Sequence, residues 1–222
     1  MRYFWMVFSV IAILLSSCSG NSSEGRKWME TQGKLHVIST TAMINDLVSA
    51  VGGEYIAPYT LIERGLDPHS YQLVKGDDEK LAKADLIFYN GLGLEHGASL
   101  QYYLANSNKA ISIGGEINAA HPDKVLHVGM QTDPHIWMDA SLFSEAIPII
   151  VKALSEKDPQ HASDYAAAGA KKKAALDSLH SSIRELLSLI PQDRRYLVTS
   201  HDAFNYFTRA YLAQKGEDET AW

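Results

Sequence analysis

The chain has 222 residues, a formal net charge of −6 and 46% hydrophobic residues. This length suggests one or two domains, with enough apolar side chains to bury a core. An acidic balance of this kind lacks the basic footprint of nucleic-acid binding, so no nucleic-acid partner is expected. Cys18 is the single cysteine, which excludes an intramolecular disulfide.

The first eighteen residues have the features of an export signal. Arg2 precedes an apolar run over residues 3–15, which fits the hydrophobic region of a signal peptide and is shorter than the roughly 20 residues needed to span a bilayer. The run leads into Leu15-Ser16-Ser17-Cys18, which resembles the lipobox of bacterial lipoproteins. We therefore expect residues 1–17 to be a signal peptide and Cys18 to carry a lipid.

Residues 18–33 follow the proposed lipidation site. They are rich in Ser, Gly and Glu and have no apolar period, which is typical of a flexible linker. We predict a lipidated, flexible tether here. The protein is then expected to be exported, periplasmic or on the cell surface, and anchored to the membrane through Cys18.

Residues 34–157 are predicted to form an N-terminal α/β lobe. Strands are predicted at residues 35–40, 55–61, 84–90 and 109–113, and helices at residues 43–51, 75–83 and 141–154. Strands that alternate with helices predict a parallel sheet covered on both faces. Ligands of such sheets bind at the carboxyl ends of the strands. Two Asp-Pro-His triplets, residues 67–69 and 133–135, lie at or after such ends.

Residues 158–191 are predicted to be one connecting helix. At 1.5 Å per residue the helical run measures about 45 Å, which is longer than one lobe needs and indicates a link between two lobes. Residues 192–222 would begin a C-terminal lobe, with a strand at 195–200 that leads to His201 and a helix at 204–212. One strand and one helix cannot bury their apolar faces, so this second lobe is expected to be incomplete.

Three histidines are the candidate metal ligands: His69, His135 and His201. A proline directly precedes each of the first two, which restricts the backbone and aims the side chain from its loop. Neutral imidazole is the commonest protein metal ligand and suits zinc, iron, nickel or copper. The residues alone also allow ordinary polar roles. To share one ion, the ring nitrogens must lie closer than about 8 Å.

Four ordered motifs make the interpretation more specific. They are Glu63 to Gln72 (ERGLDPHSYQ), Ala84 to Glu95 (ADLIFYNGLGLE), Asp133 to Asp139 (DPHIWMD) and Thr199 to Phe207 (TSHDAFNYF). Together they resemble the metal-binding receptors of bacterial ABC transporters for zinc, manganese or iron, and the match covers residues 34 to about 212.

The resemblance implies a two-lobed α/β fold joined by a rigid long helix, with the metal between the lobes. It implies that His69 and His135 bind from the first lobe and His201 from the second. The protein would capture a divalent manganese, zinc or iron ion and deliver it to a membrane permease. Because the chain has no P-loop, a separate ATPase would supply the energy.

The sequence departs from this family in two places. The family's fourth ligand is a carboxylate late in the second lobe, and Trp222 precedes that position. Asn205 stands where the family usually has glycine. Between the first two ligands the only other histidines are His96, His121 and His127, which favours manganese, iron or mixed use over zinc alone. His36, His96, His161 and His180 are assigned no metal role.

Two other classes of function remain. A metal-dependent hydrolase could use three histidines and an open position for water, but the chain has no His-Glu-x-x-His helix and no obvious general base. Ser200-His201-Asp202 is no catalytic triad, because adjacent residues of a strand point to opposite faces. A surface adhesin or interaction lipoprotein is the other alternative. The expected function is not enzymatic.

Overall fold

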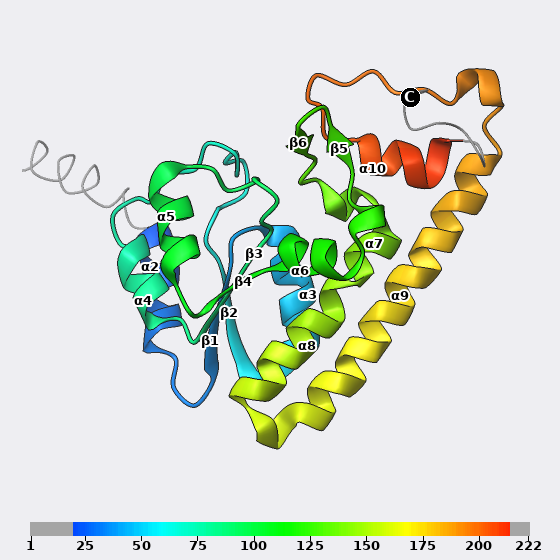
Figure 1. Cartoon of the computed structure of the whole chain (residues 1–222). Coiled ribbons are helices and arrows are strands. Elements are labelled where there is room, and N and C mark those ends of the chain that lie inside the picture. Colours follow the sequence, from blue (N-terminus) through cyan, green and yellow to red (C-terminus); the bar gives the residue numbers. More distant parts are fainter. Residues whose placement is uncertain (1–19, 214–222) are drawn as a thin grey trace, which may run out of the picture.

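The computed structural model describes residues 20–213. The predicted signal peptide and Cys18 therefore lie outside the described residues. Figure 1 shows an α/β lobe from which one long helix leads to a smaller group of elements near the end of the described chain. Within the described part, no helix is long and apolar enough to cross a membrane.

A four-stranded parallel sheet forms the centre of the first lobe. Its order is β2-β1-β3-β4, with β2 at Ile56–Thr60, β1 at Leu35–Ser39, β3 at Leu86–Tyr89 and β4 at Ala110–Ser112. Strand β1 lies between two neighbours, and Val37 pairs with Pro58 on one side and Leu86 on the other. Pro58 is tolerated because β2 is an edge strand.

Helices cover both faces of this sheet (Figure 1). On one face lie α2 (Gly20–Glu30), α4 (Asp77–Lys83) and α5 (Ala98–Asn106), and on the other lie α3 (Ala42–Gly52), α6 (Ile113–Ala120) and α8 (Ala146–Lys157). Ile38 and Ile87 are buried toward the first group, whereas Val37 and Phe88 are buried toward the second. This alternation along buried strands builds two apolar cores and confirms the α/β class.

The first helix corrects the prediction of a flexible tether. Residues 20–30 form α2, and Trp28 packs into the sheet with only 6% of its surface exposed. Its indole Nε1 donates to the carbonyl of Ala57 at 2.8 Å, and the centroids of its ring and the nearly perpendicular His36 ring lie 4.9 Å apart. The buried indole of Trp28, with the partly buried Met29 beside it, therefore attaches a segment that has no apolar period.

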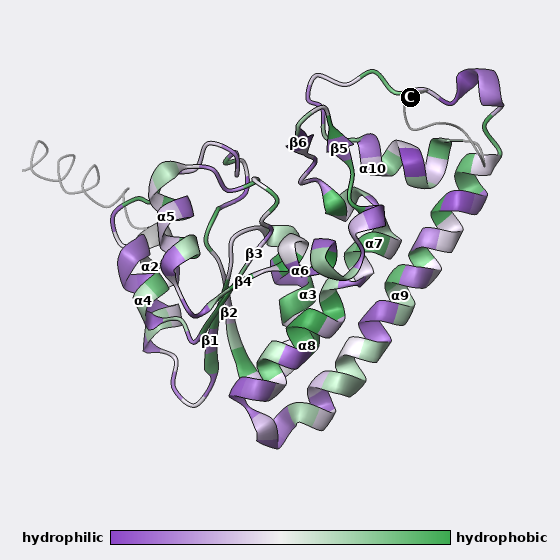
Figure 2. Ribbon diagram, viewed as in Figure 1, coloured by the Kyte–Doolittle hydropathy of each residue, from purple (hydrophilic) through white to green (hydrophobic). Residues whose placement is uncertain are grey.

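The long connecting helix is α9, at Ala162–Ser188. It packs along α3, α8 and the short α7 (Ala140–Ser144). Tyr165 is buried, and Gly169 lies where a Cβ atom would meet the Val151 side chain at 2.5 Å, so glycine permits the close approach to α8. Figure 2 shows polar and apolar residues mixed along α9, whereas α8 is largely apolar.

The segment after α9 differs from the prediction. Residues 195–200 form no strand, and Tyr196 and Val198 are 73% and 91% exposed. The predicted helix is present as α10 (Asn205–Phe207) and a π-helical turn, η6 (Thr208–Leu212). Between α9 and Ala213 the structure therefore contains no strand, so the parallel sheet expected for the second lobe is not among the described residues.

Short elements complete the described chain. An unpredicted antiparallel hairpin consists of β5 (His127–Val128) and β6 (Gln131–Thr132). Five 3-10 turns are η1 (Gly53–Tyr55), η2 (Pro122–Lys124), η3 (Ile136–Met138), η4 (Pro159–His161) and η5 (Gln192–Arg194).

Candidate metal site

The two Asp-Pro-His triplets fold in the same way. The Oδ1 atom of Asp67 accepts the backbone N–H of His69 at 3.0 Å, and Oδ1 of Asp133 accepts that of His135 at 2.9 Å. An aspartate that binds the backbone two residues ahead makes an Asx turn. Each aspartate therefore helps the proline to fix its histidine, a role that sequence reasoning gave to the proline alone.

The segment that carries His201 is held by two tyrosines. The hydroxyl of Tyr206 donates to the carbonyl of Asp133 at 2.8 Å and accepts the N–H of Leu126 at 3.0 Å. The hydroxyl of Tyr211 accepts the N–H of Ala140 at 3.0 Å. These bonds fasten α10 and η6 to the loops around the second triplet, so that His201 lies beside His135 without a strand to deliver it.

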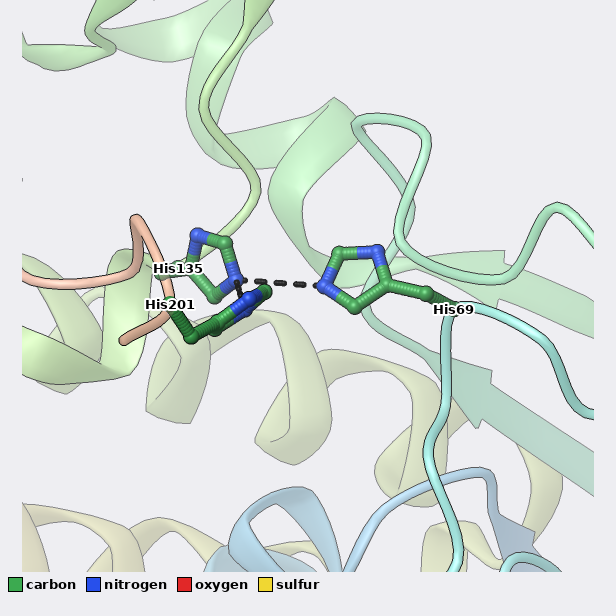
Figure 3. A group of neighbouring side chains, drawn as sticks. All are labelled: His69, His135 and His201. Atoms are coloured by element: carbon green, nitrogen blue, oxygen red, sulfur yellow. Dashed lines mark hydrogen bonds between the residues drawn. The ribbon is translucent and has the colours of Figure 1, made fainter. Parts of the chain in front are cut away.

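The three predicted histidines converge through their Nε2 atoms (Figure 3). The Nε2 atoms of His69 and His201 each lie 3.2 Å from Nε2 of His135, and all three lie within 4.8 Å of one another. Two nitrogens bonded to one zinc ion at 2.0–2.1 Å in tetrahedral geometry are about 3.3 Å apart. The spacing therefore suits a single ion, well inside the ~8 Å limit that the sequence argument set.

An open pocket of about 500 Å³ surrounds these nitrogens. Its walls come from the loop after β3, the β5-β6 hairpin, the second triplet and the turn after His201, and include Leu92, Gly93, His96, Val128, Gln131, Thr132, Asp202 and Asn205. His135 is buried, His69 is partly buried and His201 is exposed. The open side leaves room for solvent or a further ligand to complete the coordination.

The carboxylate of Asp133 fixes the tautomer of His135, and burial favours the neutral form of His69. Oδ1 of Asp133 lies 2.6 Å from Nδ1 of His135. A carboxylate only accepts, so Nδ1 carries the proton and Nε2 keeps its lone pair toward the pocket. Burial lowers the pKa of His69, and the neighbouring His135 lowers this pKa further. Burial also raises the pKa of Asp133, but hydrogen bonds from His135 and Asn205 outweigh it and keep this pKa below its usual value.

Asn205 connects the two sides of the pocket. Its Nδ2 donates to Oδ2 of Asp133 at 3.0 Å and to Oδ1 of Asp202 at 2.9 Å. Asp133 thus binds His135 with one oxygen and Asn205 with the other. The departure from glycine at this position was visible in the sequence, but its role was not, because the bond to Asp133 joins residues 72 positions apart.

Asp133→Ala is expected to weaken zinc binding about 10- to 100-fold, the usual loss when the outer partner of a ligating histidine is removed. The change frees the imidazole of His135 to rotate and to adopt the other tautomer. Isothermal titration calorimetry measures the effect. Asp123→Ala, an exposed aspartate of η2, is the matched control. Equal affinities for the two variants would mean that Asp133 does not orient His135.

The loop after β3 supports the second triplet through a hydrogen bond to its proline. The buried carboxylate of Glu95 accepts the Thr40 hydroxyl at 2.6 Å and the N–H groups of Asn90 and Gly91 at 2.8 and 3.0 Å. Burial raises the pKa of Glu95, and these hydrogen bonds oppose the rise. Nδ2 of Asn90 donates to the carbonyl of Pro134 at 2.9 Å. In the sequence Glu95 stands out only as part of a motif, and no local signal indicates this support.

The remaining histidines named in the sequence lie elsewhere, with one exception. Nε2 of His36 lies 3.0 Å from the carbonyl of Trp28, and His161 pairs with Asp158 at 2.6 Å. His180 lies 3.3 Å from Asp139, between α9 and α7. His96 is the exception, because it lines the pocket and its ring centroid lies 5.4 Å from that of His69.

Comparison with known proteins agrees with this fold. Residues 37–218 match the family described as zinc-uptake complex component A, periplasmic (ZnuA). The chain therefore belongs to the ZnuA family. It is 36% identical over 207 residues to the metal-binding protein YtgA of Chlamydia muridarum, covering 93% of this chain and 62% of that protein. It is 29% identical to the manganese ABC transporter substrate-binding lipoprotein PsaA of Streptococcus pneumoniae, covering 93% of this chain and 67% of PsaA.

Solved structures of similar proteins have the same fold. The crystal structure of Fe(III)-bound YtgA from Chlamydia trachomatis superposes with a TM-score of 0.81 at 37% identity, covering 85% of this chain and 66% of that one. The periplasmic zinc-binding protein TroA from Treponema pallidum gives a TM-score of 0.75 at 33% identity, covering 81% and 64%. The chain thus spans about three fifths to two thirds of the length of these relatives.

Proposed function

We propose that this protein is a receptor that captures one divalent transition-metal ion through the Nε2 atoms of His69, His135 and His201. The observation that carries the proposal is the convergence of these three nitrogens within 4.8 Å at the end of a parallel sheet, where such folds bind ligands. The carboxylate of Asp133 behind His135 supplies the outer partner that ligating histidines usually have.

Manganese, zinc and iron are the proposed ions. Imidazole donors suit zinc and iron, and an open position filled by oxygen ligands also suits manganese. Membership of the ZnuA family supports this choice, and the names of the relatives mention manganese, Fe(III) and zinc. The ion is cargo here, so the pocket must release it as well as bind it.

Delivery to a membrane permease is the second part of the proposal. The permease and a separate ATPase are proposed as partners because several relatives are named as ABC transporter substrate-binding lipoproteins. In this scheme residues 1–17 direct export and Cys18 carries the lipid anchor. The protein is then periplasmic or on the cell surface. Residues 34–157 form the first lobe, residues 158–191 form the connecting helix, and residues 192–222 begin the second lobe.

A titration with Zn²⁺, Mn²⁺ and Fe²⁺ by calorimetry tests the proposal. We expect one ion per chain, and an affinity about 10- to 100-fold weaker at pH 5.5 than at pH 7.5. Bound imidazoles must be neutral, so protons compete with the ion increasingly below the ordinary imidazole pKa of about 6.5. Because the pKa of His69 is lowered, this side chain stays neutral further into acid and adds less to the loss.

The same samples distinguish the alternatives. A receptor binds the ion without turning over an activated ester such as p-nitrophenyl acetate, whereas a hydrolase built on the open position would turn it over. No heat of binding for any of the three ions would leave an interaction lipoprotein as the better hypothesis. An affinity that stays constant between pH 7.5 and 5.5 would contradict imidazole ligation.

A further inference from the structure

His96 has the features of a ligand, although it is not one of the converging three. It follows β3 after a turn in which Gly91, Leu92 and Gly93 all have positive φ, at 73°, 54° and 84°. Its Nδ1 atom lies 2.7 Å from the carbonyl oxygen of Gly93. A carbonyl only accepts, so Nδ1 carries the proton and Nε2 keeps a free lone pair.

This arrangement repeats the one at His135. There, the carboxylate of Asp133 holds the proton on Nδ1 and leaves Nε2 for the metal. Ligating histidines usually donate the other ring N–H to a carboxylate or a backbone carbonyl, which fixes both the tautomer and the ring direction. The Gly93 carbonyl does this for His96, so the side chain is set to bind through Nε2.

His96 is an exposed residue of the pocket wall. Its ring centroid is 5.4 Å from that of His69, and the His69 and His201 rings are also 5.4 Å apart. The group whose nitrogens all lie within 4.8 Å contains His69, His135 and His201 and does not include His96. Exposure falls from His96, which is exposed, through the partly buried His69 to the buried His135, and His201 on the other side of His135 is exposed.

We propose that His96 is a transfer ligand, which binds the arriving ion together with His69 and passes it to His135 and His201. This inference rests on the proposed function of the three converging histidines. The ion exchanges its waters for imidazoles one at a time, starting at the exposed His96 and ending at the buried His135. No covalent bond of the protein changes, and the proton stays on Nδ1 of His96, donated to the Gly93 carbonyl, throughout.

A transfer ligand has a kinetic signature. His96 holds the ion on the way in and on the way out, but it is absent from the final coordination. It therefore lowers the barrier for capture and release equally, and it leaves the equilibrium affinity almost unchanged. A resident fourth ligand would instead strengthen the affinity, mainly through slower release.

Stopped-flow fluorescence with Zn²⁺ can measure both rates. Trp137 is a natural reporter because its ring lies 5.2 Å from that of His135 in an edge-on arrangement. The full chain, purified in detergent because of its apolar N-terminal run, is mixed with Zn²⁺ for capture and with excess chelator for release. The variants are His96→Ala and His96→Asn, since asparagine can still donate to the Gly93 carbonyl. His121→Ala, which changes a histidine outside the pocket lining, is the control.

We expect both His96 variants to capture and release Zn²⁺ about tenfold more slowly, with an affinity within about threefold of the unaltered chain. The absorption spectrum of the Co²⁺ complex should not change, because the final ligands are the same. His121→Ala should match the unaltered chain in every measurement.

Three results would overturn the inference. Unaltered rates in His96→Ala, or normal rates in His96→Asn, would show that the imidazole is not used. Weaker affinity with faster release and a changed Co²⁺ spectrum would make His96 a ligand of the bound state. If the unaltered chain bound no Zn²⁺ at all, the proposed function itself would fail, which is distinguishable from a failure confined to His96.

Discussion

Replacing His135 with alanine is expected to weaken Zn²⁺ binding by more than about 100-fold, beyond the 10- to 100-fold typical of losing an outer partner. His135 is the central member of the three, because its Nε2 lies 3.2 Å from the Nε2 atoms of both His69 and His201. Its removal takes away one of the three proposed metal ligands and leaves only His69 and His201. Competition against a chromogenic zinc chelator measures the affinity.

The control for this variant is His127→Ala. His127 lies in the β5-β6 hairpin beside the pocket but does not line it, so its loss should change the affinity little. Circular dichroism and thermal unfolding of both variants separate a lost ligand from a lost fold. A His135→Ala chain that is folded and binds Zn²⁺ within about tenfold of the unaltered protein would place the ion elsewhere.

The sheet was predictable because the sequence of each strand by itself indicates a buried strand. Val37, Ile38, Ile87 and Phe88 are almost completely buried and belong to short apolar runs. Such runs are typical of parallel strands that are covered on both faces, and the alternation with helices then fixes the class of fold. The long connecting helix was equally visible, because its length exceeds what one lobe requires.

The errors arose where a segment's structure depends on a partner that is distant in the chain. Residues 20–30 have no apolar period, and the indole of Trp28 reaches Ala57, 29 positions away. Residues 196–198 are Tyr, Leu and Val, of which Tyr and Val have high strand propensity. A strand also needs a neighbour to bond with, and in the described part of the chain Val198 is left 91% exposed.

The same limit explains which part of the site was foreseen. His69 and His135 stand in a local motif, Asp-Pro-His, whose geometry is set within three residues. The contacts that assemble the pocket are long-range, since Asn205 and Tyr206 bind Asp133 across more than 70 positions. Pattern and spacing could select the ligand candidates, but not the residues that hold them in place.

Glu95→Ala is expected to lower the free energy of unfolding by about 3 kcal/mol, the scale of breaking a buried, hydrogen-bonded charge. The carboxylate accepts three hydrogen bonds, from Thr40, Asn90 and Gly91. Alanine leaves these three donors without that acceptor, and the loop after β3 loses its anchor. Urea denaturation followed by far-ultraviolet circular dichroism measures the change.

Two further variants determine whether the hydrogen bonds are the cause. Glu95→Gln keeps Oε1 for Thr40 and Asn90, but it turns an amide nitrogen toward the N–H of Gly91, so the loss should lie between those of the unaltered chain and the alanine variant. Glu156→Ala, on the exposed side of α8, should change stability by no more than about 0.5 kcal/mol. If Glu95→Ala were as stable as Glu156→Ala, the buried carboxylate would contribute nothing net. The loop that bonds to Pro134 beside His135 would then be held by its backbone alone.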